Sequence, residues 1–119
     1  MIGFTDNLPT VYLCSAPVDF RKGMRSLAVL VETHLQKDPF VDGLFVFCNR
    51  QRTSVKIIYW ERNGFCLWQK RLEKERFFWP RDVSRAVMEL TGRQLNWLLE
   101  GYDISRMKPH QELHYCSVL

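Results

Sequence analysis

The stretch "GLFVFCNRQRTSVKIIYWERNGFCLWQKRL", residues 43–72, contains three runs rich in β-branched and aromatic residues, separated by short polar segments. Runs of this length and composition favour β-strands, so the stretch predicts strands at 43–48, 54–61 and 65–72. The short polar segments leave room only for tight turns, which join antiparallel neighbours. This part of the chain therefore predicts the centre of an antiparallel β-meander.

The segments on either side extend this pattern. "TVYLCS" at 10–15 predicts a strand before the meander, and "RFFWP" at 76–80 predicts one more strand after it. Apolar residues recur at spacings of four and three from Phe20 to Leu35, which predicts a helix with Asp19 as its N-cap. Because Pro39 restricts the residue before it, that helix is expected to end near Lys37.

A second helix is predicted from "LTGRQLNWLLEGYD", residues 90–103. Thr91 and Gln94 match a capping box, and Gly101 suits the C-terminal stop. The expected fold class is α+β: a single domain with an antiparallel β-meander sheet packed with two principal helices. We expect this domain to span residues 1–105 and a C-terminal tail to span 106–119.

Length and composition agree with a single globular domain, since the chain has 119 residues, of which 46% are hydrophobic and 25% charged. No run approaches the roughly 18 apolar residues of a membrane helix, and the N-terminus lacks the pattern of a signal peptide. We therefore expect a soluble, cytoplasmic protein. The four cysteines are widely scattered, which argues against a disulfide framework and against a Cys-only zinc site.

The net charge of +4 is concentrated in the middle of the chain. Residues 50–85 contain ten cations and four anions, a local excess of +6, interleaved with seven aromatic residues. Surfaces that bind nucleic acid combine these residue types. Half-buried strands with an aromatic face and a charged face show the same pattern, so both interpretations remain open.

The hairpin within 54–72 allows a more detailed prediction. Asn63-Gly64 is a preferred two-residue turn, and it would set Lys56 opposite Arg71 on a mixed, cationic face. The other face, which includes Ile57 and Trp68, is assigned to the core against the helices. Two cations in direct opposition suggest either a phosphate between them or side chains that extend into water.

Residues 19–23, "DFRKG", raise a separate question, because cations at a helix N-terminus oppose the helix dipole. Local stability therefore does not explain Arg21 and Lys22. Either a partner or an intramolecular salt bridge, for instance with Glu100 or Asp103, would explain them. A glycine at position 23 would permit the close approach of a backbone or a phosphate.

Several segments together resemble a known family. They are "DFRKG" at 19–23, "GLFVF" at 43–47, "NRQR" at 49–52, "KIIYW" at 56–60, "FFWP" at 77–80 and "LLEGYD" at 98–103. Over about residues 9–108 the chain resembles TnpB, the small accessory protein encoded by the second open reading frame of IS-66 family insertion sequences. The resemblance implies a role in DNA transposition beside a separate, larger transposase, and it implies no known chemistry.

The residues themselves indicate no catalytic set. A metal-dependent nuclease needs two or three converging carboxylates, and most acids here have a simpler explanation as caps, turn residues or partners of nearby cations. His110, His114 and Cys116 have a spacing that a helical tail could present to zinc, but Pro109 favours a loose end. We expect no enzymatic activity, no cofactor and no metal.

The expected function is that of a non-catalytic accessory factor whose partners are the transposase and DNA at the ends of the element. The residues expected to bind nucleic acid or a partner are Arg21, Lys22, Arg50, Arg52, Lys56, Trp60, Arg62, Lys70 and Arg71. The alternative is a protein adaptor that makes no DNA contact and is anchored to the transposase by Trp60, Phe65, Trp79 and Trp97. These two classes differ in whether the protein retains DNA in a salt-dependent way.

Overall fold

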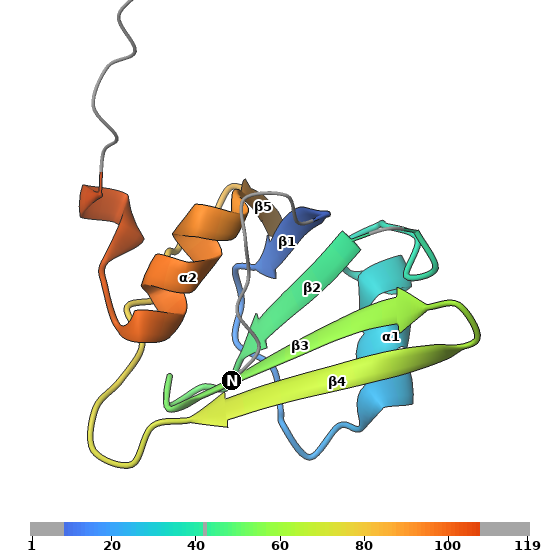
Figure 1. The fold of residues 1–119 in the computed structure, drawn as a ribbon, viewed down its shortest axis with the longest axis horizontal. Helices are drawn as coiled ribbons and strands as arrows, with labels where there is room; N and C mark the ends of the chain where they lie inside the picture. The colour runs from blue at the N-terminus through green and yellow to red at the C-terminus, as the bar shows by residue number, and fades with distance from the viewer. Residues whose placement is uncertain (1–8, 42, 108–119) are drawn as a thin grey trace, which may run out of the picture.

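The computed structural model describes residues 9–41 and 43–107, which form a five-stranded mixed sheet with a helix on each face (Figure 1). The strand order is β4-β3-β2-β1-β5. The elements in chain order are β1 (Thr10–Cys14), α1 (Met24–Thr33), β2 (Gly43–Cys48), β3 (Ser54–Glu61), β4 (Gly64–Arg71), β5 (Val87–Leu90), α2 (Gly92–Glu100) and the short 3-10 helix η1 (Ile104–Arg106). The expected α+β class is confirmed, and β2, β3 and β4 form the predicted meander.

The centre of the sheet departs from a pure meander. β1 and β2 run parallel, because the chain crosses over between them through α1 instead of turning back directly. All six residues of β2 are buried, as expected for a strand that is covered on both faces. The side chains of β2 alternate between two cores: Leu44 and Val46 belong to the core under α2, whereas Phe45 and Phe47 belong to the core under α1.

This double coverage corrects one expectation. The hairpin pattern assigns only the opposite face to the core, but Ile58, on the mixed, cationic face that carries Lys56, is fully buried in one core with Leu27 and Val31 of α1. On the opposite face, Ile57 packs with Leu95 and other residues of α2. The apolar run of β2 is the physical sign of two covered faces, since a strand with one wet face alternates apolar and polar residues.

The predicted strand at 76–80 is wrong. This segment pairs with no strand; instead, the side chains of Phe77 and Trp79 enter the core on the α2 face. The indole Nε1 of Trp79 donates a hydrogen bond to the carbonyl oxygen of Cys14 at 2.9 Å. β5, which the sequence analysis does not predict, pairs with β1 as the other edge strand of the sheet.

The register of the hairpin also differs from the expected one. Glu61 pairs with Gly64, so the turn residues are Arg62 and Asn63, and Arg62 has a positive φ of 53°. Lys56 consequently lies opposite Gln69 and not opposite Arg71. A shift of two residues leaves every side chain on its predicted face, because side chains alternate with a period of two.

The helix ends show where sequence signals are reliable. For α2 the prediction is confirmed: Thr91 and Gln94 form both hydrogen bonds of the capping box, and Gly101 ends the helix with a φ of 102°. α1, however, begins at Met24 with Gly23 as its N-cap, and it ends at Thr33 rather than near Lys37. The first helix is therefore shorter than predicted at both ends, and Asp19 is not its cap.

Candidate nucleic-acid interface

Lys56 organises the loop that precedes α1. Its side chain points from β3 toward α1, the residue is only 8% exposed, and its Nζ donates to the carbonyl oxygens of Phe20 at 3.0 Å and Lys22 at 3.3 Å. The same ammonium lies 4.9 Å from the centre of the Phe20 ring, within cation–π distance. Lys56 therefore holds residues 20–22 in place from beneath, and it is not on the molecular surface.

Asp19 and Arg21 form a compact turn above this anchor. The carboxylate of Asp19 accepts hydrogen bonds from the backbone N–H of Arg21 at 2.9 Å and from its guanidinium, with a shortest N···O distance of 2.6 Å. Of the two explanations left open for Arg21, the intramolecular salt bridge is present, but its carboxylate is that of Asp19, two residues away, and not that of Glu100 or Asp103. The side chain of Arg21 remains 91% exposed, so a second anion can still reach it.

The turn between β2 and β3 is shaped by one asparagine. The Oδ1 of Asn49 accepts from the backbone N–H groups of Thr53 and Ser54 at 2.9 and 3.0 Å, and its Nδ2 donates to Thr53 Oγ1 at 2.9 Å. This bonding closes residues 49–53 into a tight loop in which Arg50 is exposed. The loop is joined to the segment before α1 by the hydrogen bond from Val18 N–H to the carbonyl oxygen of Cys48 at 2.9 Å.

Three arginines from separate segments gather around two adjoining hollows. Arg21 and Arg50 line a hollow of about 510 Å³, and Arg71 at the end of β4 lines a second one of about 540 Å³. The two hollows share the walls formed by Phe20, Asn49 and Gln51. Lys22 is exposed next to them, and we name the surface formed by Arg21, Lys22, Arg50 and Arg71 the basic end.

The remaining predicted site residues do not join the basic end. Trp60 and Arg62 lie at the other end of β3, about 20 Å away at the usual rise per residue. Lys70 points to the α2 face, where its Nζ donates to the carbonyl oxygen of Leu99 at 2.8 Å. Arg52 adjoins the basic end but has a left-handed backbone with a φ of 62°, and its carbonyl oxygen accepts from Phe77 N–H.

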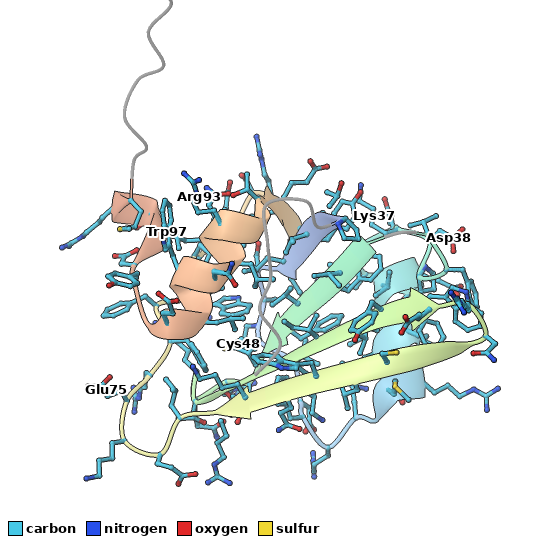
Figure 2. The ribbon with its side chains drawn as sticks, in the orientation of Figure 1. Lys37, Asp38, Cys48, Glu75, Arg93 and Trp97 are labelled. Carbon is cyan, nitrogen blue, oxygen red and sulfur yellow. The ribbon has the colours of Figure 1, made fainter. Side chains whose placement is uncertain are left out.

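At the opposite end of the sheet, three rings form a cluster that we name the aromatic end: Phe40, Trp60 and Phe65, with centroids 5.0–5.4 Å apart. Phe40, which the sequence analysis does not select, is 54% exposed. Its only sequence signal is an aromatic residue directly after Asp38-Pro39 in a turn. Figure 2 shows the two ends: Cys48 marks the basic end of β2, and Lys37 and Asp38 mark the aromatic end.

The described residues offer little for catalysis. Burial raises the pKa of the Cys14 thiol to about 11 and that of Cys48 to about 12, so both are protonated and weakly nucleophilic at neutral pH. No group of three His, Cys, Asp or Glu side chains within 9–41 and 43–107 is arranged to hold a metal ion. The tail residues His110, His114 and Cys116 lie outside the described residues.

In the part of the chain that the structure describes, no helix has the length and apolar character needed to cross a bilayer.

The Asp19–Arg21 pair gives a pH prediction. Hydrogen bonds from the guanidinium and the backbone N–H of Arg21 lower the pKa of Asp19 from 3.8 to about 2. Because the folded-state pKa is the lower one, the contribution of the pair to stability is complete above pH 3.8 and is lost as the pH falls toward 2. A carbon-detected NMR titration should therefore place the midpoint of the Asp19 carboxyl near pH 2.

In the Arg21→Met variant that midpoint should rise toward 3.8, whereas Arg25→Met, which changes an exposed cation on α1, should leave it unchanged. A wild-type midpoint at the ordinary value would contradict the turn described above.

Comparison with known proteins gives a family and two relatives. The family model described as "IS66 Orf2 like protein" matches residues 9–109, a range that includes every helix and strand described above. Protein y4jC of Sinorhizobium fredii is 33% identical over 108 residues, which cover 91% of this chain and 91% of the relative. Protein y4hO of the same species is 37% identical over 93 residues, which cover 78% of this chain and 80% of the relative. No solved structure gives a significant match.

Proposed function

The chain belongs to the IS66 Orf2-like family of insertion-sequence accessory proteins, and on that premise we propose that it binds the phosphate backbone of DNA through the basic end while a separate transposase performs the chemistry. DNA at the ends of the element is the expected ligand. In this proposal the protein is cytoplasmic and bacterial, like the element it serves.

The observation that carries the proposal is the convergence of cations at the basic end. Arg21, Arg50 and Arg71 come from a loop, a turn and a strand end, yet they surround two adjoining hollows. Arginine presents a planar fork of N–H donors that matches phosphate oxygens. Backbone contacts of this kind supply most of the affinity of non-specific DNA binding.

Contacts within the protein lead us to propose a smaller set of residues for this role. Lys56 and Lys70 donate to backbone carbonyl oxygens of the protein itself, so we assign them to its stability and not to DNA. Arg62 lies in the turn at the other end of the hairpin, where it would meet only a ligand that spans the sheet. The proposal therefore rests on Arg21, Lys22, Arg50 and Arg71, with Arg52 adjoining them.

Catalysis is assigned to the transposase for a chemical reason. Phosphoryl transfer by a nuclease or transposase uses carboxylates that hold divalent ions. Asp19 is the acid that lines the hollow of Arg21 and Arg50, and its carboxylate is engaged by Arg21. The family is likewise not a known family of enzymes.

A second candidate function, that of a protein adaptor, is favoured by the exposed ring of Phe40 at the aromatic end. Two of its four proposed anchors remain, namely Trp60 and Phe65. Trp79 is buried and hydrogen-bonded within the core, and Trp97 packs against the same core, so neither forms part of a docking surface in our account.

A gel-shift titration on the terminal inverted repeats of the element, with and without transposase, tests the proposal. DNA retention by the protein alone, weakening steeply as salt is added, is the expected result. Indifference to DNA together with co-purification of the transposase would overturn it in favour of the adaptor. Nicking of supercoiled plasmid by the protein alone, with magnesium or manganese, would overturn the assignment of chemistry to the transposase.

A further inference from the structure

The long edge of β4 is open. β4 is the outermost strand of the sheet, and Figure 1 shows no described helix or strand beside its outer edge. The N–H of Leu72 donates to the carbonyl oxygen of Thr53 at 2.8 Å. This hydrogen bond shows which residues of β4 have their backbone groups bonded to β3. Because antiparallel ladders alternate, the even-numbered residues of β4 face β3. The N–H and C=O groups of Phe65, Leu67, Gln69 and Arg71 therefore point outward.

This edge lacks the usual protection against pairing. Natural edge strands are kept short, interrupted by proline or bulges, or charged along their length. β4 has eight residues and no proline, its register with β3 is continuous, and its two charged side chains are both at its C-terminal end. β5, at the other edge of the sheet, has only four residues.

We propose that β4 pairs antiparallel with β4 of a second copy of this chain, around a two-fold axis at Trp68. This register sets Phe65 opposite Arg71 of the second copy and Leu67 opposite Gln69 of the second copy. In this register each of the four residues with outward-pointing backbone groups lies opposite another of the four, so their N–H and C=O groups can form hydrogen bonds between the two copies. Every other antiparallel register of this strand leaves at least one of the four without such a partner.

The side chains on the α1 face complement one another in this arrangement. Arg71 of each copy lies opposite Phe65 of the other, whose ring already packs with Phe40 and Trp60. A guanidinium over such rings gains cation–π attraction. β4 carries Arg71 at one end and Phe65 at the other, so antiparallel pairing places a cation of one copy beside an aromatic ring of the other at both ends of the strand.

The α2 face gives a second, independent match. Lys70 of one copy lies opposite Cys66 of the other, and the Sγ of Cys66 is 3.5 Å from a carboxylate oxygen of Glu61. The ammonium of Lys70 already donates to Leu99 of its own chain, but it has three N–H donors and can also reach the exposed carboxylate of Glu61 in the neighbouring copy. These complementary charges favour a second copy over an unrelated strand. The inference shares only Arg71 with the proposed DNA contact: in the dimer the guanidinium of Arg71 lies over the rings of the second copy, and Arg21, Lys22 and Arg50 carry the contact with DNA.

The mass in solution gives the first test. Light scattering on the eluting full-length protein should give about 28 kDa, twice the 14.2 kDa of one chain. Leu67→Lys and Gln69→Pro should each give the monomer mass. The N–H that Gln69→Pro removes points outward, so no hydrogen bond between β3 and β4 is lost. Val29→Lys, which replaces an apolar residue on α1 that is 53% exposed, against 42% for Leu67, should remain a dimer.

Cross-linking tests the register. Lys70→Cys, made in a Cys116→Ser background, should form a disulfide-linked dimer on mild oxidation, because position 70 lies opposite Cys66 of the second copy. Within one strand, positions 66 and 70 are about 13 Å apart, too far for a disulfide. The same variant with Cys66→Ser should stay uncross-linked.

A wild-type monomer would overturn the proposal. So would a dimer that survives both edge substitutions and yields no cross-link, since its interface would lie elsewhere. Binding of a strand of the transposase to this edge, with the free protein monomeric, would also overturn it.

Discussion

Replacing Trp79 by alanine is expected to lower the free energy of unfolding by roughly 3–5 kcal/mol, the usual cost of truncating a large buried aromatic side chain. The ring is 7% exposed in the core on the α2 face, and its N–H satisfies the carbonyl oxygen of Cys14 at the end of β1. Urea denaturation followed by far-ultraviolet circular dichroism measures the loss.

The chain supplies a matched control one position away. Phe78 is 56% exposed, so Phe78→Ala should change the free energy of unfolding by less than about 0.5 kcal/mol. If Trp79→Ala prevents folding altogether, Trp79→Phe keeps most of the ring and should lose about 1–2 kcal/mol with the hydrogen bond. Equal effects of Trp79→Ala and Phe78→Ala would contradict the placement of residues 76–80.

Lys56→Met is expected to lower the free energy of unfolding by about 1–3 kcal/mol, because the carbonyl oxygens of Phe20 and Lys22 would lose their donor. Methionine keeps most of the apolar volume of the lysine stem, so the loss reports on the ammonium contacts and not on a cavity. Urea denaturation again provides the measurement.

Lys74→Met is the matched control, since it removes the same charge from an exposed lysine in the loop after β4. It should change stability by less than about 0.5 kcal/mol. Wild-type stability in Lys56→Met would show that the loop before α1 does not depend on this lysine.

The elements that the sequence predicts are those with local signals. The strands of the meander follow from runs of β-branched and aromatic residues, and α2 follows from Thr91, Gln94 and Gly101, whose chemistry acts within one turn of the helix. β5 has only four residues and becomes a strand through its pairing with β1, which lies far away in the sequence. Residues 76–80 have strand-like composition, but burial of Phe77 and Trp79 decides their path.

The candidate site was only partly predictable for the same reason. Arg21, Lys22 and Arg50 stand out as cations in polar segments, and the structure brings them together. Lys56 also stands out as a cation, but its partners lie 34 and 36 residues away, so the sequence gives no sign of its burial. A cation within an apolar strand indicates either a surface site or a buried contact, and only the tertiary structure distinguishes them.

The central claim is that the basic end holds the DNA backbone. The most informative variant is Lys22→Glu, Arg50→Glu, because both side chains are exposed and neither is assigned to the core or to the β4 edge. Its matched control is Arg93→Glu, Arg106→Glu, which changes the net charge by the same amount. Figure 2 shows Arg93 on α2, far from the basic end.

The measurement is the dependence of DNA affinity on salt concentration for the wild type and both variants. The account predicts that the slope of log K against log salt becomes shallower by about 2 in Lys22→Glu, Arg50→Glu, one unit for each lost phosphate contact. The control variant should keep the wild-type slope. An equal change in the two variants, or a wild type that retains no DNA, would contradict the claim.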